Sequence, residues 1–207
     1  MIAEDILCKD AWIRKLEAQL ICPEQLLQYL LKKQFRFTWH PLGFAMCKLI
    51  DDGISSLRVH VWPNHVQFQQ TPAWLVHNHL FHLKSWVLAG EIENHEYLVD
   101  GSKEEHAVYE TRYKQGKSIL HKSQNTCSKK IISNESFLAG QTYEVATGVF
   151  HKSEIKSAGV AVTVCETTEM VNTTPLVLGD LNGSPIYSFT RKVCSSPDLI
   201  KLIKGLA

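Results

Sequence analysis

Two histidines in this sequence stand at a spacing that could build a metal site. His77 and His79 are one residue apart, so on an extended strand both side chains would point to the same face. Their Cα atoms would lie about 6.5 Å apart, and both imidazoles could then reach one ion at about 2.1 Å. Imidazole also moves protons near neutral pH. Taken alone, however, the pattern more often marks half-buried strand histidines that only satisfy hydrogen bonds.

The elements that would position these histidines follow from the apolar pattern. Residues 9–34 predict two helices, because Trp12, Leu16 and Leu20 recur every fourth residue and Pro23 stands where the second helix, 24–33, would begin. From residue 44 onward, short β-branched and aromatic runs alternate with turn residues, which predicts strands. The expected strands are 44–50, 56–62, 75–88, 92–99, 107–113, 118–121, 142–146, 160–166 and 185–189. Ser196-Pro197-Asp198 predicts an N-capped final helix over 196–206.

This many short, regularly spaced strands favour a β-sandwich or barrel over βαβ units. We expect one domain over 1–207, with a helical cover over 1–40 and the barrel over 41–190. A formal net charge of +1 shows no excess of positive charge that would favour binding to nucleic acid. The sequence has no apolar run of about 20 residues, so no membrane span is predicted. The acidic start, Met1 to Asp5, is unlike a secretory signal, so we expect a cytoplasmic protein with a small-molecule partner.

Two further stretches place the histidine pair in a family context. Gly90 comes eleven residues after His79 and ends an apolar run. Farther along the chain, Gly140, Gly148 and His151 form a second stretch in which glycines precede a histidine. These stretches resemble the two conserved motifs of the cupin family, over roughly residues 40–170. The resemblance implies a double-stranded β-helix, or jelly-roll, barrel in which His151 faces the H-x-H pair. In such a barrel Gly148 would adopt positive φ.

The sequence departs from the cupin pattern at the ligand that is usually a glutamate, because His82, Leu83 and Lys84 occupy the nearby positions. Thr71, Ala146 and Ile155 likewise replace a glycine, a proline and an asparagine of the motifs. Three histidines without a carboxylate resemble the thiol dioxygenase branch of the cupins, which implies Fe(II) held by His77, His79 and His151, with O2 as a second substrate. Nitrogen ligands also suit Zn, Ni or Mn. No organic cofactor is expected.

Other residues are candidates for positioning a substrate. Three neutral imidazoles leave a divalent ion its full charge, which favours a small anionic metabolite. If the polar face of 56–62 looks into the barrel, Arg58 could clamp a substrate carboxylate, and Tyr143 could donate to a carboxylate or an oxygen species. His82 could be a fourth ligand if a bulge turned it inward, although packing or support of the ligands is the simpler role. Tyr109 and Arg112 could donate in the same way as Tyr143, although a structural role is the default for all three. No role is expected for His40, His95, His106 and His121, the last three being expected in exposed surroundings.

The sequence therefore predicts an Fe(II)-dependent oxygenase on a mainly β cupin barrel with N-terminal helices and a short C-terminal helix. Two other functions stay open: a non-redox isomerase or lyase that uses Zn(II) or Ni(II), and a barrel that binds a small ligand without turnover. Oxygen consumption would separate the oxygenase from these two alternatives. The cupin resemblance also makes a homodimer one option, although no residue here identifies an interface.

Overall fold

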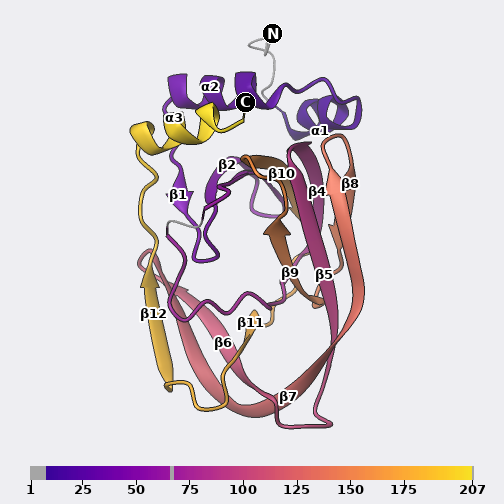
Figure 1. The fold of residues 1–207 in the computed structure, drawn as a ribbon, viewed down its shortest axis with the longest axis vertical. Coiled ribbons are helices and arrows are strands. Elements are labelled where there is room, and N and C mark those ends of the chain that lie inside the picture. The colour runs from indigo at the N-terminus through magenta and orange to yellow at the C-terminus, as the bar shows by residue number, and fades with distance from the viewer. Residues whose placement is uncertain (1–7, 66–67, 207) are drawn as a thin grey trace.

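The computed structural model describes residues 8–65 and 68–206, so Met1 to Asp5 lie outside it. Three helices lie together over one end of a β-barrel (Figure 1): α1 (Lys9–Glu17), α2 (Pro23–Lys32) and α3 (Ser196–Lys204). Pro23 begins α2 as expected, and α3 is capped by Ser195, whose hydroxyl accepts from the backbone N–H of Asp198. Within the described ranges no helix is long and apolar enough to span a bilayer.

Two antiparallel sheets make up the barrel. The first sheet has the order β1 (Thr38–Trp39), β2 (Ala45–Asp51), β3 (Ser56–Trp62), β10 (Ala161–Thr168), β4 (His82–Ala89) and β8 (Thr142–Val145). The second has the order β11 (Leu176–Gly179), β6 (His106–Lys114), β7 (Lys117–Leu138), β5 (Glu91–Asp100) and β9 (Phe150–Ile155), with β12 (Ile186–Thr190) paired to β7. The predicted fold class, a mainly β barrel with helices at its N-terminal and C-terminal ends, is confirmed.

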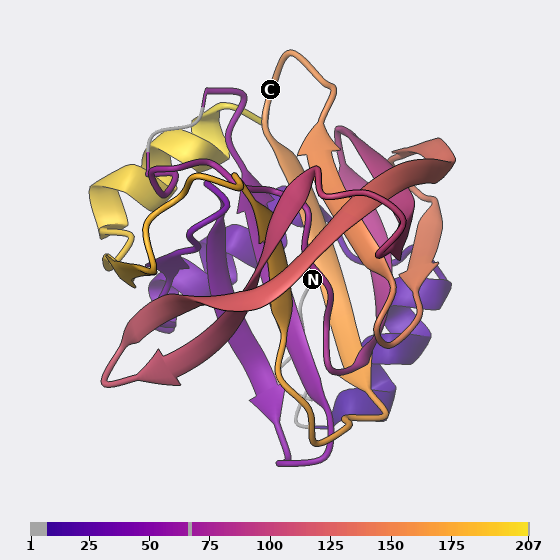
Figure 2. The same ribbon diagram turned by 90° about the horizontal axis from the view of Figure 1, so that it is seen from below.

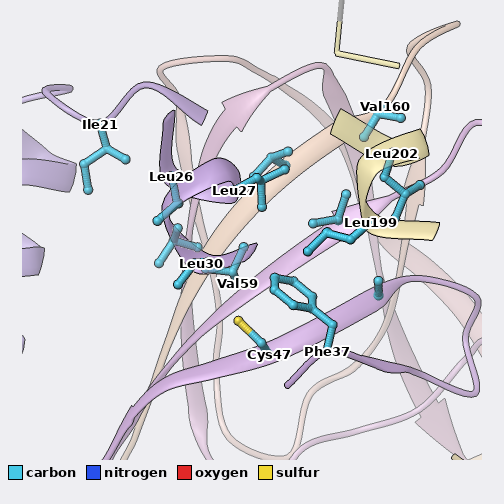
Figure 3. Packing of buried hydrophobic residues seen from close by; sticks show 14 of the residues in the cluster. Ile21, Leu26, Leu27, Leu30, Phe37, Cys47, Val59, Val160, Leu199 and Leu202 are labelled. Carbon is cyan, nitrogen blue, oxygen red and sulfur yellow. The ribbon is translucent and has the colours of Figure 1, made fainter. Parts of the chain in front are cut away.

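Strand β3 shows how the sequence creates two buried layers. Leu57, Val59 and Val61 alternate with Arg58, His60 and Trp62, so the two sets point to opposite faces of the sheet. The apolar set belongs to the core under the helices, in one cluster with Leu26, Leu27 and Leu30 of α2 (Figure 3). Burial of such side chains contributes about 1.5–3 kcal/mol each. The other set faces into the barrel, where His60 and Trp62 are also buried.

The second sheet is closed into a ring through one residue. His77 forms isolated antiparallel bridges both to His151 on β9 and to Val177 on β11, which are the two ends of the sheet order. The backbone of residues 76–78 exchanges hydrogen bonds with both neighbours, for example from Leu178 N–H to Val76 O at 2.9 Å. Seen from below, β7 runs across the end of the barrel that lies opposite the three helices (Figures 1 and 2). Residues 76–78 therefore act as a seam between β9 and β11.

The structure corrects several predicted boundaries. The predicted strand 75–88 begins only at His82, because the preceding residues form the seam instead of a continuous ladder. Strand β7 continues to Leu138, far beyond the predicted 118–121, and strands β1, β9 and β11 were not among the predicted strands. Leu20 lies beyond the end of α1 and is 73% exposed, so it does not extend the apolar stripe. Helix α3 ends at Lys204, two residues earlier than predicted.

Gly90 provides a test of how tightly the two sheets pack. It joins β4 to β5 with φ of +74°, and an added Cβ would lie 2.7 Å from the Cβ of Ala161. We expect Gly90→Ala to destabilise the protein by about 2–4 kcal/mol through backbone strain and overpacking. Gly53→Ala is the matched control, because Gly53 has φ of +84° with no atom within 4 Å. Urea unfolding measures both, and equal losses of stability would show that packing at Gly90 is loose.

Candidate metal centre

The rings of His77, His79 and His151 meet inside the barrel. Their centroids are 4.7 to 4.9 Å apart, and each ring offers a nitrogen within 4.8 Å of the others. His151 lies on β9, whereas His77 and His79 lie in the stretch before β4. The prediction that the H-x-H pair stands on a regular strand is therefore wrong. The three rings nevertheless converge, as the resemblance implied.

Backbone hydrogen bonds fix the position of these residues. His77 N–H donates to His151 O at 3.0 Å, and His151 N–H donates to His77 O at 2.8 Å. Because directly opposed residues of an antiparallel pair point to the same face, the two rings are brought side by side. His79 O accepts from Gly148 N–H at 3.0 Å, and Gly148 has φ of +82°. The predicted positive φ of Gly148 is confirmed.

Hydrogen bonds also select which ring nitrogen is free. Nδ1 of His77 lies 2.8 Å from Leu75 O, and a carbonyl can only accept, so Nδ1 carries the proton. Nδ1 of His151 lies 2.8 Å from Oδ1 of Asn94, which also accepts from the Ser153 hydroxyl at 3.0 Å. The Nε2 atoms of His77 and His151 therefore hold the lone pairs that could ligate a metal. Nε2 of His151 is buried without a hydrogen-bond partner among the described residues, which a bound ion would satisfy.

Burial keeps these rings in the form that binds metals. Desolvation lowers the pKa of His77, and it lowers the pKa of His79 and His151 well below the usual value. Charges on the neighbouring histidines lower the pKa of His79 and His151 further. At neutral pH all three imidazoles are neutral and need not lose a proton before they coordinate an ion.

Two neighbouring spaces have residues of the cluster in their walls. An inner cavity of about 70 Å³ extends from the histidines toward Trp62 and Cys165, and an outer chamber of about 430 Å³ extends toward Trp74 and Arg191. Both are lined by His77, His79 and Arg58. As far as the structure describes their walls, neither includes an aspartate or a glutamate. The surroundings of the three imidazoles therefore favour an anion.

Arg58 lies in the wall that both spaces share. Its Nε donates to the Ser56 hydroxyl at 2.8 Å, and its guanidinium lies 5.2 Å from the ring centre of Phe81. Within residues 8–65 and 68–206 it forms no ion pair, although Asp51 acts on it at longer range. Burial lowers the pKa of Arg58, but the group stays charged at neutral pH. The polar face of 56–62 thus looks into the barrel, the condition attached to the predicted clamp.

The structure separates the other candidate residues. Tyr143 on β8 lines the inner cavity and packs on Phe137, and burial raises the pKa of its phenol, so the hydroxyl keeps its proton. Tyr109 is fully buried against Trp74, and its hydroxyl donates to Ser184 O. Arg112 pairs with Glu110 on an exposed part of β6. Neither Tyr109 nor Arg112 lines the two described cavities.

His82 does not join the cluster. It is the first residue of β4, and its Nε2 lies 3.3 Å from a carboxylate oxygen of Glu144 on β8. Three side chains form the histidine group in the described part of the chain, and His82 is not one of them. No bulge turns His82 inward, since β4 pairs with β10 without a shift from His82 to Val87 and its register shift lies at the far end, opposite Val162 and Thr163.

Two histidines that the sequence pattern did not single out, His40 and His60, line the inner cavity. Nδ1 of His60 lies 3.5 Å from Sγ of Cys165, and burial lowers the pKa of His60 to about 3. His40 stacks on Phe44 with 4.4 Å between ring centres. The alternation of 56–62 placed His60 on the face of Arg58, and that signal could have identified it. Asn94, which orients His151, had no local signal.

A second group, Glu93, His95 and Glu154, also brings three potential ligands together. His95 was expected in exposed surroundings and is instead 8% exposed, with Nε2 2.6 Å from Glu93. Lys156 and Lys152 pair with the two carboxylates. Because the lysines already balance the negative charge, this group is an ion-pair network on strands β5 and β9.

Comparisons with known proteins find a likeness in the backbone and no match to a family model or a curated sequence. Among solved structures, an RmlC-like cupin from Shewanella frigidimarina matches with a TM-score of 0.40 and 13% identity, over 68% of this chain and 88% of that one. The DMSP lyase DddQ from Ruegeria pomeroyi gives 0.37 and 15%, over 64% and 50%. The cupin domain of Schizosaccharomyces pombe Cnp3 gives 0.33 and 8%, over 60% of each chain. What the chain shares with these proteins is a likeness in the course of its backbone.

Proposed function

We propose that this protein is a metal-dependent oxygenase that uses Fe(II) and O2 on a small anionic metabolite, similar to thiol dioxygenases. The observation that carries the proposal is the set of three neutral imidazoles whose ring nitrogens converge beside cavities with no carboxylate among the described lining residues. The orphaned Nε2 of His151 supports a fit between these residues and a divalent ion.

His77, His79 and His151 would hold the ion, and Asn94 and Leu75 would keep two of the rings in the ligating tautomer. When bound, iron would supply the redox chemistry that joins O2 to the substrate. The protein's own part is to bind and orient the substrate, which lowers the entropy cost of the reaction.

Arg58 and Tyr143 would orient the substrate from two sides. An unpaired, largely buried guanidinium is costly, and a substrate carboxylate would neutralise it through two parallel hydrogen bonds. The Tyr143 phenol, protonated because it is buried, would donate a hydrogen bond from the inner cavity. The nonpolar rings of Phe81 and Phe44 would exclude water from the remaining surface of the substrate.

The non-redox alternative needs a side chain that moves a proton. His40 and His60 are the unassigned imidazoles that line the inner cavity, but burial lowers the pKa of His60 to about 3 and that of His40 well below its usual value, so both are weak bases at neutral pH. The oxygenase proposal requires no such base. This difference favours the oxygenase over an isomerase or lyase.

The experiment is metal analysis of anaerobically purified protein, followed by oxygen uptake after loading with Fe(II). Thiols, amino acids and keto acids would serve as the substrate panel. Substrate-dependent uptake would support the proposal. Tightly bound zinc or nickel without uptake would favour the alternative, and protein that takes up no metal would overturn the metal site itself.

Replacement of Arg58 gives a sharper test of substrate orientation. We expect Arg58→Lys to raise the KM for the substrate at least tenfold, because a point charge cannot replace the bidentate contact. Ser56→Ala, which removes only the hydroxyl that accepts from Arg58 Nε, should have a smaller effect. Steady-state kinetics measure both variants. An unchanged KM in Arg58→Lys would exclude the clamp.

A further inference from the structure

The far wall of the outer chamber is built by the hairpin of β6 and β7. Thr111 pairs with Leu120 and Tyr113 pairs with Ser118, so these four side chains share one face, and all four line the chamber. Arg191 follows β12 and lies beside the same hairpin, with its backbone N–H donating to Gly116 O at 3.3 Å. The wall therefore combines one guanidinium with two hydroxyls.

The polar groups of this wall lack partners. The hydroxyl oxygens of Thr111 and Ser118 have no hydrogen-bond partner among the described residues, although the side chains are only 8% and 4% exposed. Buried hydroxyls in folded proteins are normally satisfied by protein, water or ligand. Arg191 lies over the ring of Tyr113 at 5.4 Å and forms no ion pair within the part of the chain that the structure describes. The wall can thus donate several hydrogen bonds to an anion.

The charge of the chamber points the same way. Arg58 stands at its inner end, Arg191 at its outer wall, and Lys48, the third cation, is already paired with Asp51. After burial, which is the largest cause, the charge of Arg191 contributes to lowering the pKa of Arg58 and His40, so the two arginines act on one space. Neither cation has a carboxylate partner among the residues that the structure describes, so the two repel one another, and a ligand with two negative groups would neutralise both.

We propose that Arg191, Thr111 and Ser118 form a second anion subsite, which binds the distal carboxylate or phosphate of an elongated, doubly anionic ligand. The near end of the ligand would lie at Arg58 beside the histidines, and for this placement the inference rests on the proposed function. His77 and Arg191 line the same chamber, and its volume of about 430 Å³ is within the range of small-molecule sites.

Calorimetric titration of the full chain with short carboxylates tests this subsite. The probes are straight-chain monocarboxylates, α,ω-dicarboxylates of the same length, and 3-phosphonopropanoate. We expect one dicarboxylate or the phosphonate to bind at least tenfold more tightly than its monocarboxylate counterpart, as a charged hydrogen-bonded contact provides. A preference for the phosphonate over succinate would identify phosphate as the distal group, and the reverse would identify carboxylate.

Variants assign the preference to the proposed residues. Arg191→Ala should reduce the dianion-to-monoanion affinity ratio about tenfold and leave monocarboxylate binding unchanged. Thr111→Val, which keeps the side-chain shape, should reduce the ratio about threefold or more. Lys192→Ala is the matched control, because Lys192 is the exposed neighbouring cation, lies over Phe68 and does not line the chamber.

Two results would overturn the second subsite: a wild-type protein that does not prefer dianions, or a preference that Arg191→Ala leaves unchanged. Failure of the proposed function would look different. A protein without metal or oxygen uptake that still prefers dianions through Arg191 would lose the oxygenase assignment and keep the subsite.

Discussion

Replacing His151 with alanine is expected to remove bound metal from the purified protein while the barrel stays folded. The substitution deletes one of three convergent nitrogens and leaves too few ligands for a stable site. The loss of affinity should exceed the roughly 10–100-fold that is typical of removing a group which only orients a ligand. Elemental analysis after dialysis against Fe(II) or Zn(II) measures the effect.

His82→Ala is the control for this experiment, since His82 pairs with Glu144 and lies outside the cluster. It should retain one metal ion per chain. His151→Gln tests the same ligand with less loss of volume, and circular dichroism of each variant reports the fold. Stoichiometric metal in both His151 variants would refute the assignment.

Acidification of the metal-free protein is expected to destabilise it steeply below pH 6.5. Burial lowers the pKa of His60 to about 3, and lowers the pKa of His40, His79 and His151 well below 6.5. Between these values the unfolded chain takes up protons that the folded chain does not. The free energy of unfolding therefore falls as pH falls, by about 1 kcal/mol per histidine between pH 6.5 and 5.5.

Urea unfolding at pH 7.5, 6.5 and 5.5, with a chelator present, measures this dependence. His60→Gln should make it shallower by about 1 kcal/mol over the last interval, because one of the uncharged buried imidazoles is gone. A stability that does not change between pH 7.5 and 5.5 would mean that these histidines take up protons as readily in the folded chain.

Local sequence patterns predicted the elements in which the order of apolar and polar residues matches the burial of each face. Strand 56–62 has the predicted bounds, because strict alternation of apolar and polar residues matches a sheet with different partners on its two faces. Strand β7 was predicted only at its start. Residues 122–135 are mostly polar and are held by pairing with β6 up to Cys127 and with β5 from Ser128 onward, which no local pattern records.

The candidate site was predictable where spacing in the sequence coincides with geometry. His77, His79 and His151 came from a pattern of histidines and glycines, and the structure brings the three rings together. Whether they bind metal stays a prediction. Asn94 and Arg191 could not be found in this way, because each owes its place to residues far away in the chain, His151 for Asn94 and the β6–β7 hairpin for Arg191.

The seam at residues 76–78 links the lifetime of a bound ion to local opening of the barrel between β9 and β11. His77 supplies one ring to the cluster and, through its backbone, ties β9 to β11. Any fluctuation that separates these two strands also moves the ligating imidazoles apart. An ion bound to these imidazoles would oppose that fluctuation. Escape of the ion and deuterium exchange at the amides of His77 and His151 should therefore share one opening event, so that an ion which dissociates slowly marks a seam that rarely opens.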